Sequence, residues 1–296
     1  PRGQRVLSQA PAELTRERLE RLGEGIGKVV YASEHWVVKR GRSPTEIIAL
    51  VVLWRLLRRV ERILPGRLGK RLFQGRSRKI RFLRVLTQGI VLVVPKNFWY
   101  MTHIGQVWRL YRSRDRRGER LAKTHLTGTL LVPERVSFPP ARIRIAGWPG
   151  WLTVCEATER VEATLDQRLS DLAAAGRFEE IEQWLERFLD LRQSGWQHGL
   201  FSVDTHLKNF GVTGERVVLI DSGGLTKNWT EIDNRLSFDE GMEEPHVHLG
   251  LGPLLEPRPD LAERFDARWK AIVNREHVRH HWPHDSETEP RPQGSV

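Results

Sequence analysis

The segment Gln197–Leu225 reads Q-H-G-L-F-S-V-D-T-H-L-K-N-F-G-V-T-G-E-R-V-V-L-I-D-S-G-G-L and carries most of the information about fold and chemistry. Asp204 and Asn209 lie five residues apart, and Asp221 follows twelve residues later, directly after the apolar run 216–220. That run predicts a strand. An Asp and an Asn on one loop with an Asp at the end of the next strand suit Mg²⁺, which takes one or two carboxylates plus substrate phosphates. One carboxylate is left to orient a hydroxyl.

Upstream, a glycine-rich turn precedes two predicted strands. Residues 29–31 and 36–39 are β-branched or aromatic and predict strands joined as a hairpin. Ser43-Pro44-Thr45-Glu46 is a capping box with proline at the first helical position, which predicts a helix through Leu64 that ends before Pro65-Gly66. The turn carries three alternating glycines, Gly23, Gly25 and Gly27.

The remaining elements follow from hydrophobic periodicity and from turn residues. Strands are predicted at 130–133, 142–146 and 151–156, and helices at 12–20, 165–174, 178–194 and 260–273. We expect the chain between 226 and 259 to be mostly irregular. The polar, proline-containing residues 285–296 predict a disordered tail.

These motifs resemble, in order along the chain, those of the protein-kinase-like superfamily. The closer resemblance is to its small-molecule branch: aminoglycoside phosphotransferases, choline kinases and bacterial lipopolysaccharide-sugar kinases. That branch carries D-x-H-x-x-N in its catalytic loop, and residues 204–209 match all three positions. The D-F-G element corresponds to residues 221–223. The resemblance covers about 21–64 and 128–225.

The same resemblance extends to the glycine-rich turn and to the strand after it. Residues 23–30 are similar to the pattern G-x-G-x-x-G-x-V, with the last glycine one place early. Lys39 stands where V-A-I-K places its lysine. Two departures concern Ser202, where relatives carry His, and the glutamate that should pair with Lys39. Glu46 and Glu61 both lie near the apolar stripe of the predicted helix, roughly 22 Å apart, and we prefer Glu46 because it begins that stripe.

The resemblance implies an α+β, bilobal kinase-like fold that uses ATP and Mg²⁺. The N-terminal lobe would span 1–155 with a basic insertion at 65–126, and a helical C-terminal lobe would span 156–284. Asp204 would orient the acceptor hydroxyl, with Lys39, His206 and Glu46 as the other catalytic residues. Metal would be held by Asn209 and Asp221. The nucleotide would be bound by Gly23, Gly25, Gly27 and Lys39, with backbone groups of Glu156 and Thr158 at the adenine.

Charge is distributed very unevenly along the 296 residues. Residues 1–150 contain 32 Lys and Arg against 10 Asp and Glu, whereas the second half is acidic. The insertion 65–126 carries 16 basic and 2 acidic residues together with apolar stretches at 90–94, 98–101 and 108–111. Such a segment suits an anionic membrane surface or a phosphorylated glycolipid. Burial of the same stretches in a core is the competing interpretation.

Composition excludes several classes of protein. The longest apolar run, 47–54, is 8 residues, too short for a membrane-spanning helix. A single cysteine, Cys155, excludes an internal disulfide and a cysteine-based zinc site. We expect a cytoplasmic protein with peripheral membrane contact. No nucleic-acid-binding motif is present, so nucleic acid is not favoured.

The sequence leaves three functions open. The first is phosphoryl transfer from ATP to a small molecule or a glycan- or lipid-linked sugar, favoured by His206 and by the lack of an A-P-E segment after Asp221. The second is a serine/threonine protein kinase. The third is a non-catalytic pseudokinase that binds an anionic partner through 65–126.

Overall fold

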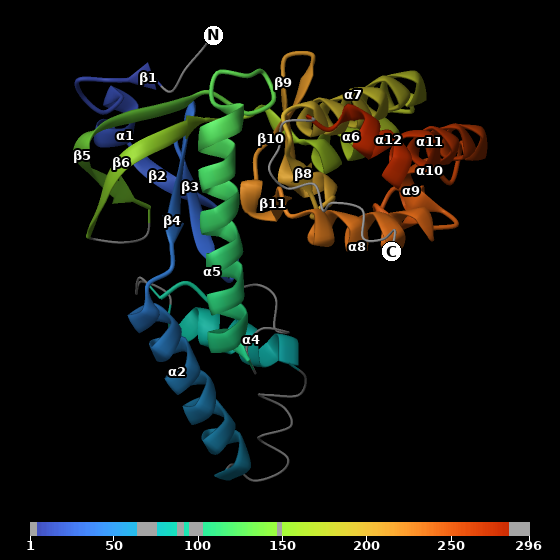
Figure 1. Cartoon of the computed structure of the whole chain (residues 1–296). Coiled ribbons are helices and arrows are strands. Elements are labelled where there is room, and N and C mark those ends of the chain that lie inside the picture. Colours follow the sequence, from blue (N-terminus) through green and yellow to red (C-terminus); the bar gives the residue numbers. More distant parts are fainter. Residues whose placement is uncertain (1–4, 64–75, 88–91, 95–102, 147–149, 284–296) are drawn as a thin grey trace, which may run out of the picture. The chain divides into compact units, whose positions relative to one another are not determined.

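The computed structural model describes residues 5–63, 76–87, 92–94, 103–146 and 150–283, which form a mixed α+β structure (Figure 1). The chain divides into two compact units. The N-terminal unit comprises Gln4–Ser113 and Arg135–Arg160, and the C-terminal unit comprises Arg114–Glu134 and Val161–Val296. Part of the predicted N-terminal lobe, residues 114–134, therefore groups with the second unit. The predicted tail, 285–296, lies outside the described residues.

The N-terminal unit is built on a sheet of six strands in the order β1-β5-β2-β3-β4-β6. Strand β5 pairs with β6 as well as with β2, so the sheet closes on itself. The inward residues of these strands, with Leu14 of α1, form one apolar core. The elements are β1 (Arg5–Val6), α1 (Ala12–Arg16), β2 (Arg18–Glu24), β3 (Lys28–Ala32), β4 (Trp36–Gly41), β5 (Arg135–Ile145) and β6 (Trp151–Glu159).

A second apolar core of the same unit lies under its helices α2 (Pro44–Ile63), α4 (Arg76–Leu86) and the first half of α5 (Ile104–Leu121). Helix α2 begins as the capping box predicts, because the Ser43 hydroxyl accepts a hydrogen bond from the Glu46 amide at 3.1 Å. Its inward side chains, Leu50 and Trp54 among them, pack with Ile80, Leu83 and Trp108.

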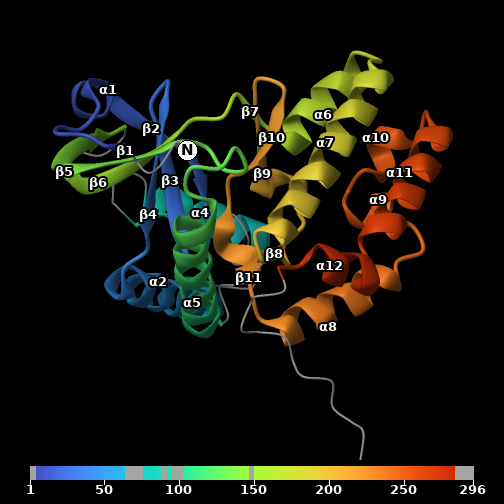
Figure 2. The same cartoon turned by 45° about the horizontal axis from the view of Figure 1, so that its top comes forward.

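The C-terminal unit surrounds one large core that includes the rings of Phe188, Trp196 and Trp269. Helix α7 (Phe178–Gln197) packs against both α6 (Leu165–Ala174) and α11 (Pro259–Ile272) (Figure 2). Its strands are β7 (Ala163–Thr164), β8 (Phe201–Ser202), β9 (Phe210–Thr213), β10 (Arg216–Leu219) and β11 (Leu225–Thr226). Its helices are α6 (Leu165–Ala174), α7 (Phe178–Gln197), α8 (Trp229–Glu240), α9 (Pro245–His248), α10 (Gly252–Leu255), α11 (Pro259–Ile272) and α12 (Arg275–His281).

Most predicted elements are confirmed, and three predictions need correction. The helix predicted at 12–20 ends at Arg16, and β2 begins at Arg18 because Leu19 enters the core of the sheet. Residues 130–133 form no strand, although the Leu131 carbonyl accepts a hydrogen bond from the Leu219 amide. The stretch 226–259, expected to be irregular, contains α8, α9 and α10.

Among the described residues, no helix combines the length and apolar character that crossing a membrane requires.

Candidate functional site

The loop that carries Asp204 connects β8 to β9 in the C-terminal unit and folds partly on itself. The half-buried Asp204 accepts a hydrogen bond from the His206 amide at 3.3 Å through its Oδ1. The Ser202 hydroxyl donates to the Asp204 carbonyl at 3.1 Å. The loop ends in a single 3₁₀ turn, Leu207–Asn209, in which Leu207 is buried in the core and His206 remains exposed. The core thus fixes the loop at Leu207.

Backbone hydrogen bonds join this loop to the residue after β10. The Asn209 carbonyl accepts from the amides of Ile220 at 2.9 Å and Asp221 at 3.1 Å. Asp221 in turn caps the 3₁₀ turn Ser222–Gly224, since its Oδ1 accepts from the Gly223 amide at 3.0 Å. The two predicted metal-binding residues, Asn209 and Asp221, are therefore held next to each other by the main chain.

Asp204 lies against the same turn. A Cβ placed on Gly224 would come within 2.7 Å of the Asp204 Cβ and 2.9 Å of its amide nitrogen. The Val203 amide donates to the Gly224 carbonyl at 2.9 Å, and β8 pairs with β11 just beyond. Only glycine permits this close approach. The backbone contacts thus bring Asp204, Asn209 and Asp221 together around one turn.

The Asp115 carboxylate of α5 also lies against the turn after Asp221, and the sequence analysis did not identify it. A Cβ on Gly223 would collide with the Asp115 carboxylate oxygen, and a Cβ on Gly118 would collide with the Ser222 carbonyl. The second half of α5 therefore packs directly on the Asp221 turn. The available sequence signals were a glycine inside a helix and an aspartate within an arginine-rich segment.

An ion pair from α8 holds α5, and a hydrogen bond from α8 holds the loop of Asp204. Arg117 makes a bidentate pair with Glu231, with both N–O distances 2.8 Å. The hydrogen bond from Arg117 lowers the pKa of Glu231 below its usual value. Arg235 donates to the Thr205 hydroxyl at 3.2 Å and lies 2.7 Å from the buried Asp239 carboxylate. Neither Arg235 nor Asp239 was singled out from the sequence.

The other predicted residues lie in the N-terminal unit. The glycine-rich turn is a tight hairpin between β2 and β3, closed by a hydrogen bond from the Gly25 amide to the Lys28 carbonyl at 2.8 Å. At its tip Ile26 is buried in the core under α2. A Cβ on Gly23 would meet no atom within 4 Å, so packing within the chain does not require glycine there. That open space suits close approach of a ligand.

The carboxylate of Glu46, expected to pair with Lys39, accepts hydrogen bonds from Arg40 at 2.9 Å and from Arg42 at 2.6 Å. Successive side chains of a strand point to opposite faces, so Lys39 lies on the face of β4 opposite to Arg40. The alternative glutamate, Glu61, pairs with Lys79 of α4 at 2.6 Å. The Glu46 carboxylate therefore balances the charges of Arg40 and Arg42.

The predicted adenine-reading residues, Glu156 and Thr158, lie inside β6, which continues to Glu159. Glu156 is in register with Ser137 of β5. Thr158 is in register with Arg135 on one side and with Val37 on the other. Because strands flank Thr158 on both sides, its backbone groups face neighbouring strands rather than an open edge.

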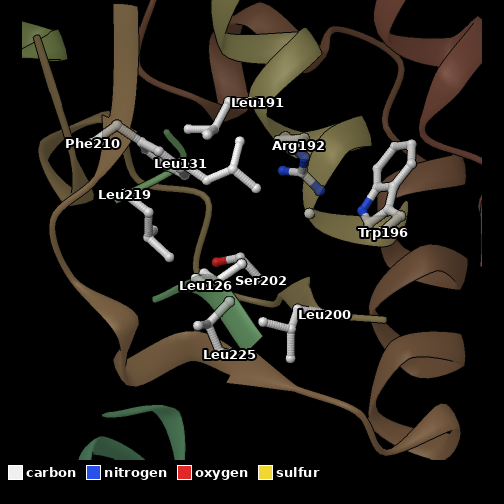
Figure 3. Close-up of a pocket in the computed structure, with 11 residues that line it drawn as sticks. Leu126, Leu131, Leu191, Arg192, Trp196, Leu200, Ser202, Phe210, Leu219 and Leu225 are labelled. Carbon is white, nitrogen blue, oxygen red and sulfur yellow. The ribbon is translucent and has the colours of Figure 1, made fainter. Parts of the chain in front are cut away.

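A small cavity of about 40 Å³ lies in the C-terminal unit, lined mostly by leucines and by Ser202 of β8 (Figure 3). The Arg192 guanidinium is buried there and stacks on Trp269, 4.7 Å from the ring centroid. Burial lowers the pKa of Arg192 to about 10, so the side chain stays charged at neutral pH. Such a volume holds a few water molecules at most, so a nucleotide does not fit.

Within the described residues, no three His, Cys, Asp or Glu side chains gather closely enough to hold a metal ion by themselves. Comparison with known proteins brings no assignment, since no protein-family model and no curated protein matches the chain.

Proposed function

We propose that the protein is a bilobal kinase-like enzyme that transfers the γ-phosphoryl group of ATP, with Mg²⁺, to a hydroxyl of a small molecule or of a glycan- or lipid-linked sugar. The observation that carries the proposal is the group formed by Asp204, Asn209 and Asp221. The Asn209 carbonyl binds the Asp221 amide at 3.1 Å, and Gly224 lets the Asp204 backbone approach the same turn. Their order along the chain is that of the kinase-like catalytic motifs.

The donor set fits Mg²⁺ by its chemistry. Asn209 and Asp221 offer an amide oxygen and a carboxylate, and Mg²⁺ prefers oxygen ligands with one or two carboxylates from the protein. Substrate phosphates and water would complete the coordination. When bound, the ion would neutralise charge on the phosphates. Asp115 would add a second carboxylate near the turn.

Asp204 would orient the acceptor hydroxyl and accept its proton. The hydrogen bond from the His206 amide to Oδ1 fixes the carboxylate and leaves Oδ2 for the acceptor. Arg235 would position the loop through Thr205 without touching the substrate. Lys39 and the backbone of the Gly23–Gly27 hairpin would bind the phosphates, and Glu156 would lie at the adenine.

A non-catalytic nucleotide- or anion-binding protein is the second candidate. It is favoured by the binding of Glu46 to Arg40 and Arg42, because active kinases use the corresponding glutamate to hold the phosphate-binding lysine. Ser202 stands where the resembled kinase loop carries histidine, and this difference also favours the non-catalytic candidate.

Two isosteric variants test the proposal, with Asp190→Asn on the exposed side of α7 as a control for the same charge change. Asp221→Asn should abolish the Mg²⁺-dependent part of ATP binding, measured calorimetrically with and without Mg²⁺. Asp204→Asn should keep ATP affinity and lose turnover of labelled ATP by about 10²–10⁴-fold, the range for a positioned base. The control should retain both.

Three outcomes contradict the proposal or redirect it. Absence of ATP binding by the wild-type chain would refute it. Unchanged Mg²⁺-dependent binding in a folded Asp221→Asn variant would refute the metal assignment. ATP binding with no turnover over a screen of hydroxyl acceptors, or a loss under about fivefold in Asp204→Asn, would favour the non-catalytic candidate.

A further inference from the structure

The outward face of α2 carries a continuous stripe of exposed apolar side chains. Its members are spaced by four or three residues, so they form one line about 22 Å long on the helix. The opposite face of α2 is already buried in the core beneath it. The stripe consists of Ile48, Val52, Leu56, Val60 and Ile63. Their exposed fractions range from 47% to 82%. Contiguous exposed apolar surface of this kind marks an interaction site.

The same face of α2 is positively charged. Arg55, Arg59 and Arg62 are exposed and follow the stripe at the same helical spacing. The two acidic residues of α2 are engaged elsewhere, since Glu46 is buried against Arg40 and Arg42, and Glu61 pairs with Lys79. The exposed surface of the helix therefore combines apolar groups with arginines that form no ion pair within the described part of the chain.

The insertion stretches that the sequence singled out are, in their described residues, partly buried and partly exposed. In the stretch 90–94, Val93 and Val94 are buried, and in 108–111 Trp108 is buried whereas Leu110 and Tyr111 are exposed. The stretch 98–101 lies outside the described residues. Helix α4, which packs beside α2, adds exposed Phe82 and Val85 within its own arginine-rich sequence.

We propose that this face of α2 docks the protein on an anionic lipid bilayer, with the helix lying in the plane of the surface. A helix with an apolar stripe and flanking arginines inserts the stripe at the boundary between headgroups and acyl chains. The arginine stems lie along the apolar surface and their guanidinium groups reach the lipid phosphates. The inference does not depend on the proposed phosphotransferase activity.

The test is cosedimentation of the full-length chain with vesicles of phosphatidylcholine, with or without phosphatidylglycerol. Binding should be stronger to the anionic vesicles and should weaken as salt rises. The double variant Val52→Ser/Leu56→Ser should reduce binding on the order of tenfold or more. The triple variant Arg55→Gln/Arg59→Gln/Arg62→Gln should reduce binding to anionic vesicles by about 100-fold.

Matched controls come from exposed residues elsewhere. Val247→Ser/Leu130→Ser removes the same side chains from the C-terminal unit, and Arg16→Gln/Arg18→Gln/Arg216→Gln removes the same charge. Both should bind like the wild type, and thermal melts should show all variants folded.

Equal losses in the stripe variants and the controls would overturn the proposal. Failure to bind anionic vesicles would also overturn it. Equal binding to neutral and anionic vesicles would contradict the role proposed for the arginines. If light scattering shows a dimer that Val52→Ser/Leu56→Ser converts to a monomer, and vesicles are not bound, the stripe is an interface between two copies of the chain instead.

Discussion

Glu46 balances the buried positive charge of the N-terminal unit. Its side chain is 7% exposed and its carboxylate is shared by two arginines, of which Arg42 has a fully buried side chain. Arg42 also donates to the Gly25 carbonyl at 2.8 Å and to the Val93 carbonyl, so it ties the glycine-rich hairpin to the core. Burial lowers the pKa of Arg42, and the nearby Glu46 carboxylate acts in the opposite direction. Loss of the carboxylate would leave two guanidinium groups facing each other in the interior.

We therefore expect Glu46→Gln to lower the free energy of unfolding of the N-terminal unit by about 3–5 kcal/mol, the cost of breaking a buried ion pair from one side. The matched variant Glu61→Gln removes the same charge from the same helix but breaks a partly exposed pair with Lys79, so its cost should stay below about 1 kcal/mol. Denaturant unfolding of both variants provides the measurement. Similar losses would mean that the cluster around Glu46 contributes little.

The residues of this cluster show where sequence reasoning stops. The capping box identified Glu46 and the start of its helix correctly, because both follow from local rules. The choice among Lys39, Arg40 and Arg42 as its partners depends on which face of β4 meets α2. Three basic residues lie within four positions, and the sequence gives no reason to prefer one of them as the partner of Glu46. The packing of the helix on the sheet determines which of them reach the carboxylate.

At the level of elements, the candidate site depends on how α5 packs against the turn after Asp221. Gly118 lies where a side chain would enter the Ser222 carbonyl, and Asp115, one turn earlier, lies beside Gly223. Arg117 anchors the same segment through its bidentate pair with Glu231 of α8. These contacts place a helix from the basic segment on an acidic turn far along the chain.

The packing of α5 makes a prediction about its two glycines. Gly118→Ala should destabilise the C-terminal unit by at least about 1 kcal/mol and weaken Mg²⁺-dependent ATP binding, because backbone rather than a movable side chain blocks the new Cβ. In Gly105→Ala, in the first turn of the same helix, the Cβ meets no atom within 4 Å, so the change should stabilise by about 0.5–1 kcal/mol. Thermal unfolding distinguishes them. Equal stabilisation by both would mean that α5 does not pack on the turn.

Elements with a regular apolar period were predictable, and those defined by distant contacts were not. Helices 165–174 and 178–194 carry such a period and occur at α6 and α7. Helix α8 depends on Asn228, whose side chain accepts from the Thr230 amide at 2.9 Å, a cap that the irregular reading of 226–259 overlooked. The motif at Asp204 could be recognised because its residues are close together in the sequence. Asp115 is distant in the sequence and comes near the turn after Asp221 only in the folded chain.

On the scale of the whole molecule, the apolar interior is divided. One core belongs to the C-terminal unit and two belong to the N-terminal unit, and none of these three clusters draws on both units in the described part of the chain. Helix α5 contributes Ile104 and Trp108 to a core of the N-terminal unit, while the short π-helix after it, Ala122–Leu126, contributes Ala122 and Leu126 to the core of the C-terminal unit. Since burial of apolar surface is the main cooperative term in folding, two units that share no core are expected to unfold separately.

Matched substitutions in the two units should therefore act on different unfolding transitions. Leu50 in α2 and Leu169 in α6 are both fully buried, one in each unit. Each change to alanine should cost about 2–5 kcal/mol, from lost transfer free energy plus the cavity left behind. In differential scanning calorimetry, Leu50→Ala should lower one transition and leave the other in place, and Leu169→Ala should do the reverse. If both variants shift one shared transition, α5 couples the units strongly enough that they unfold together, and the assignment of separate cores to separate folding units is wrong.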